Sequence, residues 1–259
     1  MKDLHPNLGL PATGRRKAIY LLGSAITLGV GALYLLVLLG LIPPTPTDVI
    51  ASWIILPVLF IPFLALWDNP GERRSRVEKF SEFGFLWLLI SGITQTVWEL
   101  PWFVLDFTGL LHGVTADDHW AWIWWAYGGA DTRYITSNPT IAGLEFMAGF
   151  SGPLELYGWY LYRFGKNTQQ KIAGCWWALA ICVGLTYLTG AFFVAEAHVG
   201  WQHIQQGVTG FWLKFIGLNL PWLIAPLICI PAAIYELGHL YRVQGYEHAL
   251  AKYDIEHQL

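Results

Sequence analysis

The sequence is short of charged residues, and this shortage excludes most soluble folds. Lys, Arg, Asp and Glu make up 13% of the 259 residues, whereas 55% are hydrophobic and 16% are aromatic. A soluble globular domain carries about 25% charged residues, so the composition indicates a membrane protein. The net charge of -3 leaves no basic stripe to replace the counterions of phosphates, and we therefore expect no nucleic-acid partner.

Cysteine is also scarce, and no motif for metal or redox chemistry is present. The three cysteines, Cys175, Cys182 and Cys229, all fall in apolar runs, so neither a disulfide framework nor a CxxC site is predicted. The sequence contains no HExxH, HxxxH or GxSxG motif and no glycine-rich loop that would hold a phosphate. This argues against a zinc protease and against a membrane di-iron oxygenase. The polar groups that remain in the apolar segments are carboxyls, amides and indoles.

Long hydrophobic runs dominate what is present. A membrane-spanning helix takes about 20 residues. Six segments qualify, at residues 18–42, 49–67, 83–107, 139–163, 173–197 and 211–235. The first follows basic residues as a signal peptide does, but its run of about 25 apolar residues is too long for one, so we expect a retained helix. The sequence therefore predicts an all-α, polytopic membrane helix bundle with about six transmembrane helices.

Lysine and arginine are distributed unequally between the two sides of this six-span arrangement. Thirteen of the 15 fall on one side, and only Arg133 and Lys214 fall on the other. Because basic residues are retained in cytoplasmic loops, both termini are predicted to be cytoplasmic. A five-span or seven-span arrangement would scatter the basic residues over both sides, so their distribution favours six spans.

One connection, residues 108–138, is much longer than the others and rich in aromatic residues. Its cluster consists of Trp120, Trp122, Trp124, Trp125 and Tyr127. Indole and phenol rings are typical of the membrane interface, where one polar atom stays in contact with water. We therefore expect an amphipathic element that lies in the interface.

Four polar side chains are predicted at similar depth in the outer half of the bilayer. At a rise of about 1.5 Å per residue, Glu99 lies about 8 residues before the outer end of its span, and Glu145 about 6 residues after the outer start of the next. Glu196 ends the fifth span, and Asn219 lies about 8 residues into the sixth. Because lipid offers no partner, such groups face a cavity or each other. The predicted walls of this buried pocket include Trp98, Trp102 and Trp222.

Each of these polar side chains also has a structural interpretation. Glu99 could bond the backbone of a neighbouring helix, and Glu145 would be interfacial if its helix began later than predicted. A single asparagine such as Asn219 is typical of contacts between packed helices. Glu196 could be an ordinary acidic residue at the membrane interface. Glu155 lies toward the cytoplasmic half of its span and has no predicted partner. The sequence leaves these alternatives open.

The fourth span carries local signals for its start and for its packing. Ser137 or Asn138 is expected to cap the helix, with Pro139 in its first turn. Gly149 and Gly152 are expected to let neighbouring helices approach closely rather than to hold a ligand.

The order of these motifs resembles the emopamil-binding protein family, the 3β-hydroxysteroid Δ8-Δ7 isomerases of the EXPERA superfamily. The segment WWAYGGADTRYITSNPTIAGLEFMAGFSGPLELYGW resembles the central signature of that family. In FWLKFIGLNLPWLIAP, Asn219 and Trp222 match its Asn-x-x-Trp pair, and GITQTVWELPWFVL is similar to the segment that carries its active-site His and Glu. The likeness spans about residues 83–245. We therefore expect an N-terminal region at 1–82 with two transmembrane helices, the first of which is extra to the family. An EXPERA-like region of four helices at 83–245 would carry catalysis or ligand binding, and 246–259 would be a cytoplasmic tail.

The sequence departs from the family pattern at two positions. Gln95 stands where the family has His, if Glu99 is aligned with the family Glu, and this alignment requires a one-residue insertion before WFVL. Ala148 stands where the family has Thr. Because glutamine cannot shuttle a proton as histidine does, either the two carboxyls act alone or the reaction is altered or lost.

The resemblance implies an isomerase that shifts a sterol ring double bond through a carbocation. One carboxyl would add a proton to one carbon while the other removes a proton from a nearby carbon. On this basis Glu99 is the predicted donor or relay and Glu145 the acceptor. Asn219 would orient one of them or the developing charge, and Trp222 would stabilise the cation with its ring face. No metal or redox cofactor is implied.

The predicted ligand is a sterol or a related polycyclic lipid, in contact with membrane lipid. The predicted substrate-binding residues are Gln95, Trp98, Trp102, Tyr134, Ala148 and Glu196. The resemblance also implies the endoplasmic reticulum membrane if the protein is eukaryotic, while the formation of a homodimer is left open. Three alternatives remain: a non-catalytic sterol-binding or lipid-binding protein, an isomerase of another polycyclic terpenoid, and a transporter, which six spans without a repeat make weak.

Overall fold

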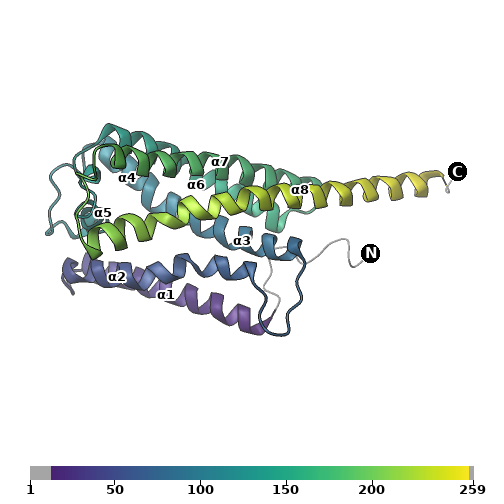
Figure 1. Ribbon diagram of the computed structural model, residues 1–259, viewed down its shortest axis with the longest axis horizontal. Helices are drawn as coiled ribbons and strands as arrows, with labels where there is room; N and C mark the ends of the chain where they lie inside the picture. Colours follow the sequence, from purple (N-terminus) through teal and green to yellow (C-terminus); the bar gives the residue numbers. More distant parts are fainter. Residues whose placement is uncertain (1–12, 257–259) are drawn as a thin grey trace.

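The chain folds into long helices that run side by side along one axis (Figure 1). The computed structural model describes residues 13–256, and within this range the only β-type pairing is an isolated bridge between Asp131 and Ile204. The predicted all-α class is therefore confirmed. Lys2, which contributed to the predicted orientation, and the last three residues of the predicted tail lie outside the described residues.

The main helices are α1 (Gly14–Leu38), α2 (Pro44–Leu59), α3 (Arg76–Thr94), α4 (Leu100–Phe107), α5 (Trp122–Gly128), α6 (Pro139–Phe164), α7 (Thr168–His198) and α8 (Leu218–Glu256). Short 3-10 segments form η1 (Ile61–Leu66), η3 (His119–Ala121) and η4 (Thr132–Tyr134). Two segments are π-helices, η2 (Gln95–Glu99) and η5 (Val208–Gly217). Because η2 joins α3 to α4 and η5 leads into α8, both π-helices lie within longer helical rods.

Helix starts follow the polar residues that precede them. The Asn138 side chain accepts from the backbone N–H of Thr140 and Ile141, and Pro139 occupies the first turn of α6, so the predicted cap is confirmed as Asn138. Ser75 and Glu78 form a reciprocal capping box at the start of α3. Capping satisfies N–H groups that have no partner inside the helix. Since α6 begins where predicted, Glu145 lies inside the helix rather than before it.

Within residues 13–256, five helical segments are long and apolar enough to cross a membrane: Gly14–Leu38, Pro44–Leu66, Arg76–Phe107, Thr168–His198 and Val208–Tyr253. They agree with five of the six predicted spans, and the polytopic membrane bundle is confirmed.

α6 is the predicted span that this criterion omits, because it carries two glutamates, four glycines and three tyrosines. It packs against α3, η2, α4 and α7. Its outward face is nevertheless apolar, with exposed side chains that include Phe146, Met147, Phe150, Leu154 and Phe164. An apolar outer face with buried carboxyls inside is typical of a helix in a membrane bundle. Local hydropathy therefore underestimates α6, since its polar residues face the protein.

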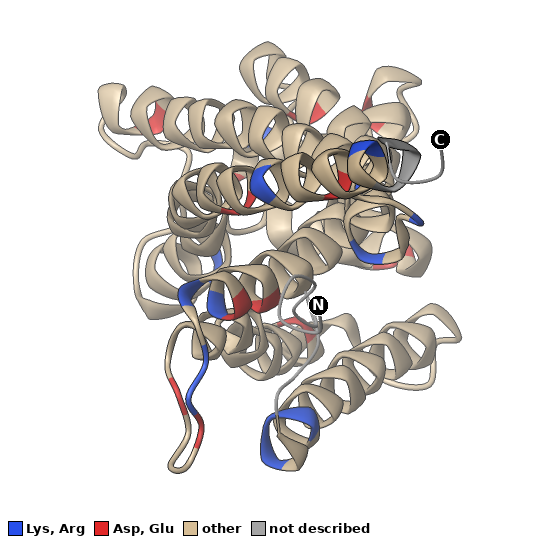
Figure 2. Ribbon diagram, turned by 90° about the vertical axis from the view of Figure 1, so that its right-hand side faces the viewer, with Lys and Arg blue, Asp and Glu red and all other residues tan. Residues whose placement is uncertain are grey.

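The start of α1 and the end of α8 lie at the same end of the bundle (Figure 1). Figure 2 looks at that end, where Lys and Arg occur on several elements. The cytoplasmic location of this end stays a prediction. The two basic residues predicted on the other side are Arg133 and Lys214, which are 2% and 5% exposed. Each contacts a carboxylate, so neither is an exposed cation on the predicted outer face.

A buried ionic network ties α1 to the loop before α3. Arg16 Nη2 contacts Glu72 Oε2 at 2.6 Å, and Arg74 Nη1 contacts Glu82 Oε2 at 2.6 Å. Glu72 also accepts from Thr13 Oγ1 at 2.6 Å, and its side chain is 2% exposed. These contacts place the N-terminal helix against the rest of the bundle.

Acid is expected to weaken this connection. The hydrogen bond from Arg16, assisted by those from Thr13 and the Asn69 backbone, holds the pKa of Glu72 well below its ordinary value of 4.5. A carboxyl whose pKa is lowered by folding stabilises the fold above its unfolded pKa and loses that contribution as the pH falls toward the folded pKa. The wild type should therefore melt a few degrees above Glu72→Gln at pH 7, with a smaller difference below about pH 4.5. Thermal unfolding of both proteins across this pH range checks this, and a difference that does not depend on pH would contradict it.

Candidate active site

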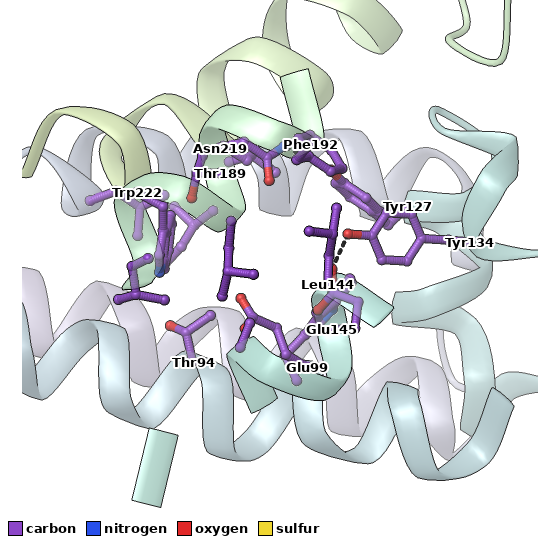
Figure 3. Close-up of a pocket in the computed structure, with 17 residues that line it drawn as sticks. Thr94, Glu99, Tyr127, Tyr134, Leu144, Glu145, Thr189, Phe192, Asn219 and Trp222 are labelled. Atoms are coloured by element: carbon purple, nitrogen blue, oxygen red, sulfur yellow. Dashed lines mark hydrogen bonds between the residues drawn. The ribbon is translucent and has the colours of Figure 1, made fainter. Parts of the chain in front are cut away.

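A cavity of about 290 Å³ lies inside the bundle, between α2, η2, α6, α7 and the start of α8 (Figure 3). Most of its wall is apolar. Its polar lining comes from Thr94, Glu99, Tyr127, Tyr134, Glu145, Thr189 and Asn219. An apolar cavity with a few convergent polar groups is typical of a small-molecule site.

The π-helix η2 presents two of the lining residues, Trp98 and Glu99. Its last turn closes with a bond from the N–H of Leu100 to the carbonyl of Gln95, and Pro101, which has no N–H, follows at once. A π-turn holds one residue more than an α-turn, so it would accommodate the one-residue insertion expected in the predicted match to the family. Trp124 Nε1 donates to the backbone oxygen of Trp98 at 3.1 Å and holds this turn in place. Such turns are frequent at functional sites.

Two glycines bring α6 against this turn. A Cβ on Gly149 would lie 2.7 Å from Leu100 Cα, and a Cβ on Gly152 would lie 2.8 Å from the backbone nitrogen of Thr96. Only glycine permits this backbone contact. The prediction that these glycines allow close approach of helices is confirmed, and the approach places Glu145 opposite η2.

Glu99 and Glu145 both point into the cavity, from η2 and α6 (Figure 3). Glu145 Oε1 accepts a hydrogen bond from the Tyr134 hydroxyl, whereas Glu145 Oε2 has no partner among the described residues. Glu99 Oε2 likewise has no hydrogen-bond partner in this part of the chain. A buried carboxyl oxygen without a partner is costly, so the two groups are available to a ligand or to a proton.

The indole ring of Trp102 packs against Tyr134. Trp102 Nε1 donates to the backbone oxygen of Tyr134 at 3.2 Å, and the two rings meet edge to face at 5.0 Å. Burial, and after it the charge of Glu145, raises the pKa of the Tyr134 phenol well above its usual range. The hydroxyl therefore stays protonated and acts as the donor to Glu145.

Asn219 and Trp222 lie on the opposite wall, one turn apart on α8 (Figure 3). Asn219 Nδ2 donates to the Tyr127 hydroxyl and to the Phe215 carbonyl, both at 2.7 Å. These bonds fix the orientation of the amide. The ring of Trp222 packs on Trp87 at 5.3 Å. Seven of the ten predicted site residues line this cavity: Trp98, Glu99, Tyr134, Glu145, Ala148, Asn219 and Trp222.

The structure does not bring Gln95 to the cavity. Its Nε2 donates to Ser91 Oγ at 2.9 Å and its Oε1 accepts from Ser151 Oγ at 2.6 Å. The prediction that it binds substrate rested on its match to the family His, four residues before Glu99. Ser91 on α3 and Ser151 on α6 instead hold the Gln95 side chain, which is fully buried and does not line the cavity.

Trp102 and Glu196, also predicted in the pocket, do not line the cavity either. Trp102 is fully buried behind Tyr134. Glu196 instead accepts from the backbone N–H of His203 at 2.8 Å and contacts Arg133 Nε at 3.4 Å. Arg133 also bonds Asp131 through two nitrogens, at 2.8 and 2.6 Å. Glu196 therefore anchors the segment that carries Tyr134.

The aromatic loop is packed more deeply than predicted. Trp122 and Trp124 are buried, at 4% and 8% exposure, so α5 is a part of the core rather than an element that lies free in the interface. The sequence analysis missed Tyr127 as a cavity residue. Its hydroxyl meets an amide 92 positions away, and no local pattern reports such a contact.

Glu155 lies outside the cavity. It is 1% exposed, and its carboxyl is near Ser91 without a regular hydrogen bond. Among the described residues, no group of three His, Cys, Asp or Glu side chains is placed to hold a metal ion.

Some of the residues that line this cavity lie in a region that matches a known protein family. The family model described as EXPERA (EXPanded EBP superfamily) matches residues 119–232. The predicted resemblance is confirmed. The EXPERA match includes Glu145, Asn219 and Trp222 and begins after Glu99. The two carboxyls of the cavity thus come from different parts of the chain, one inside the matched region and one before it.

Three relatives illustrate the range of similarity. The 3-beta-hydroxysteroid-Delta(8),Delta(7)-isomerase of Mus musculus is 29% identical over 169 residues, which are 64% of this chain and 65% of the relative. A probable isomerase of the same name from Oryza sativa subsp. japonica is 24% identical over 165 residues, 63% of this chain and 71% of the relative. A protoglabretal synthase of Ailanthus altissima is 21% identical over 172 residues, 66% of this chain and 74% of the relative. The chain spans just under two thirds of the mouse relative's length.

Proposed function

We propose that this protein is a membrane-embedded isomerase that moves a ring double bond of a sterol-like polycyclic lipid. The observation that carries the proposal is the pair of carboxyls, Glu99 and Glu145, each with an unpaired oxygen in one apolar cavity. The names of the mouse and rice relatives support the reaction class. The endoplasmic reticulum membrane is part of this proposal if the organism is eukaryotic.

The reaction needs one proton donor and one proton acceptor on the same ring system. Glu99 gives its proton to one carbon of the double bond, and a tertiary carbocation forms at the other carbon. Glu145 then removes a proton from a carbon next to the cation, and the new double bond forms there. One proton enters the lipid and one leaves it, so the product is an isomer and no oxidant or reductant is consumed.

Neighbouring side chains prepare the two carboxyls for these roles. Tyr134 holds one oxygen of Glu145 by a hydrogen bond and leaves the other free to accept the proton. The rings of Trp98 and Trp222 line the cavity, where an aromatic face stabilises a cation by about 1–2 kcal/mol. Asn219 is held by Tyr127, and its remaining amide oxygen is the group that would orient the acid or the developing charge.

The proton must return from Glu145 to Glu99 before the next turnover. Gln95, at the position of the family His, bonds Ser91 and Ser151 and takes no part in this return. In this proposal the proton therefore returns from Glu145 to Glu99 through the cavity between them.

A non-catalytic sterol-binding or lipid-binding protein is the second candidate. Gln95 and Ala148 favour it, since neither side chain can carry a proton. The name of the Ailanthus relative favours a third, an isomerase of another polycyclic terpenoid.

Expression in cells that lack their own Δ8-Δ7 isomerase separates the sterol isomerase from the binding protein. Sterols are profiled by mass spectrometry, with an empty vector as the control. We expect Δ8-sterols to fall and Δ7-sterols to rise. Unchanged sterols together with saturable sterol binding by the purified protein would instead support the binding protein.

A further inference from the structure

A second cavity, of about 230 Å³, lies beside the first and is built partly by the N-terminal helices. Its wall includes Val30 and Tyr34 of α1, Asp48 and Ser52 of α2, and Lys214 of η5. Four residues line both cavities: Ile55, Trp98, Tyr127 and Leu218. The rings of Trp98 and Tyr127 meet edge to face at 5.3 Å within this shared wall. The two cavities are thus neighbours that share one wall.

A buried ion pair forms one wall of the second cavity. Lys214 Nζ donates to Asp48 Oδ2 at 2.5 Å and to the carbonyl of Ala126 at 2.9 Å. Asp48 is 8% exposed and Lys214 is 5% exposed. An ammonium group has three N–H donors, so one donor of Lys214 is unused by these bonds. Asp48 Oδ1 is buried and has no hydrogen-bond partner among the described residues.

The unused donor and the unused acceptor together define the chemistry that fits this wall. A hydroxyl can donate to Asp48 Oδ1 and accept from Lys214 Nζ at the same time. A carboxylate ligand would meet the charge of Asp48, and an amine would meet the charge of Lys214, so each would be repelled by one member of the pair. The arrangement therefore selects a neutral hydroxyl over charged groups.

We propose that the Asp48–Lys214 pair is a subsite for the hydroxyl group of a polycyclic lipid whose ring system occupies the first cavity. This inference rests on the proposed function, because it takes the ligand to be a hydroxylated ring lipid. It assigns a role to the N-terminal region, since Asp48 lies outside the residues that the family model matches. It also accounts for Lys214, one of only two basic residues predicted on the outer side.

The pair also joins α2 to η5, so a role in packing alone must be separated from a role in binding. A buried ion pair with an unsatisfied oxygen stabilises a fold poorly. The attraction between the two charges offsets the cost of their desolvation only when their other hydrogen-bonding atoms also have partners. A ligand hydroxyl would make those bonds.

The test compares two ligands that differ only in the hydroxyl. The full chain is reconstituted in phosphatidylcholine nanodiscs, and the Kd is measured for a 3β-hydroxy Δ8-sterol and for its 3-deoxy analogue. A hydrogen bond to a charged group predicts that the wild type binds the hydroxylated sterol about tenfold to a hundredfold more tightly. Asp48→Asn and the double variant Asp48→Asn with Lys214→Gln should reduce this ratio toward one and leave the Kd of the deoxy analogue unchanged. The double variant leaves no unpaired charge, so it retains the fold if the single variant does not.

Thr47→Val provides a matched control on the same turn of α2. Thr47 is also buried, its hydroxyl donates to the carbonyl of Pro43 at 2.6 Å, and it does not line the cavity. This variant should keep the wild-type ratio. Equal binding of the two ligands by the wild type would overturn the subsite, as would a uniform loss of both affinities in the Asp48 variants.

Turnover of the hydroxylated sterol is measured in the same nanodiscs. Conversion without a preference for the hydroxyl would remove the subsite and leave the isomerase. A preference without conversion would remove the isomerase and leave the subsite. Absence of binding for both ligands would overturn both proposals.

Discussion

Replacement of Glu99 or Glu145 by glutamine is expected to lower the rate of double-bond migration by at least about a hundredfold while sterol still binds. Glutamine keeps the shape of glutamate, but it can neither give nor take the proton that the reaction moves. General acid and general base catalysis each contribute about 10²-fold to 10⁴-fold. The measurement is kcat for conversion of a Δ8-sterol by the purified protein, together with the Kd for the same sterol. A loss in kcat with little change in Kd is the expected pattern.

Glu155→Gln is the matched control for these two variants. Glu155 is also a buried acid on α6, but it lies outside the cavity, so its replacement should leave kcat near the wild-type value. Conversion at the wild-type rate by both cavity variants would refute the carboxyl mechanism. An equal loss in all three variants would show that a buried acid supports the fold rather than the chemistry.

Gly149→Ala and Gly152→Ala are expected to reduce both stability and turnover. The added methyl group would lie 2.7 Å from Leu100 Cα in the first variant and 2.8 Å from the Thr96 backbone nitrogen in the second. Backbone atoms cannot move aside as a side chain can, so α6 and η2 must separate. Overpacking of this kind costs about 1–3 kcal/mol. The separation also moves Glu145 away from Glu99, and a displacement of about 1 Å lowers the rate about a hundredfold.

Gly143→Ala tests whether this effect depends on the contact rather than on the glycine. Gly143 lies on the same helix, and a Cβ added to it would meet no packed neighbour within 4 Å. Alanine there should keep the activity and raise the stability by about 0.5–1 kcal/mol, because it favours the helix more than glycine does. The melting temperature and kcat/KM are measured for all three variants. Equal behaviour of the three would contradict the role given to the two contact glycines.

The residues that line the two cavities come from different parts of the chain. The region that the family model matches contributes Glu145, Asn219 and Trp222. The segment before it contributes Glu99 to the first cavity and Asp48 to the second. A search confined to the matched region would therefore find Glu145 but miss both Glu99 and Asp48.

The number of predicted spans illustrates a limit of hydropathy. Five segments are apolar enough to be recognised by composition alone. α6 begins at Pro139, within the predicted bounds, yet its composition is too polar for that criterion because Glu145 and Glu155 face the protein interior. The apolar run at 139–163 nevertheless predicted this helix, and its outward side chains show why a polar average is compatible with the bundle.

The sequence by itself determined the membrane class and the start of α6, whereas α8 runs to Glu256, far beyond the end predicted for the sixth span at residue 235. A helix start follows from its cap, which is a local property. The depth of Glu99, Glu145 and Asn219 in a bilayer stays a prediction. Only the tertiary structure decided which side chains face the cavity. Ser91 and Ser151 hold Gln95 outside the cavity, and Arg133 and His203 hold Glu196 elsewhere. Tyr127 and Asp48 meet partners 92 and 166 positions away. The direction of a side chain around its helix depends on turn type and on contacts with other helices, and a run of residues read alone contains neither.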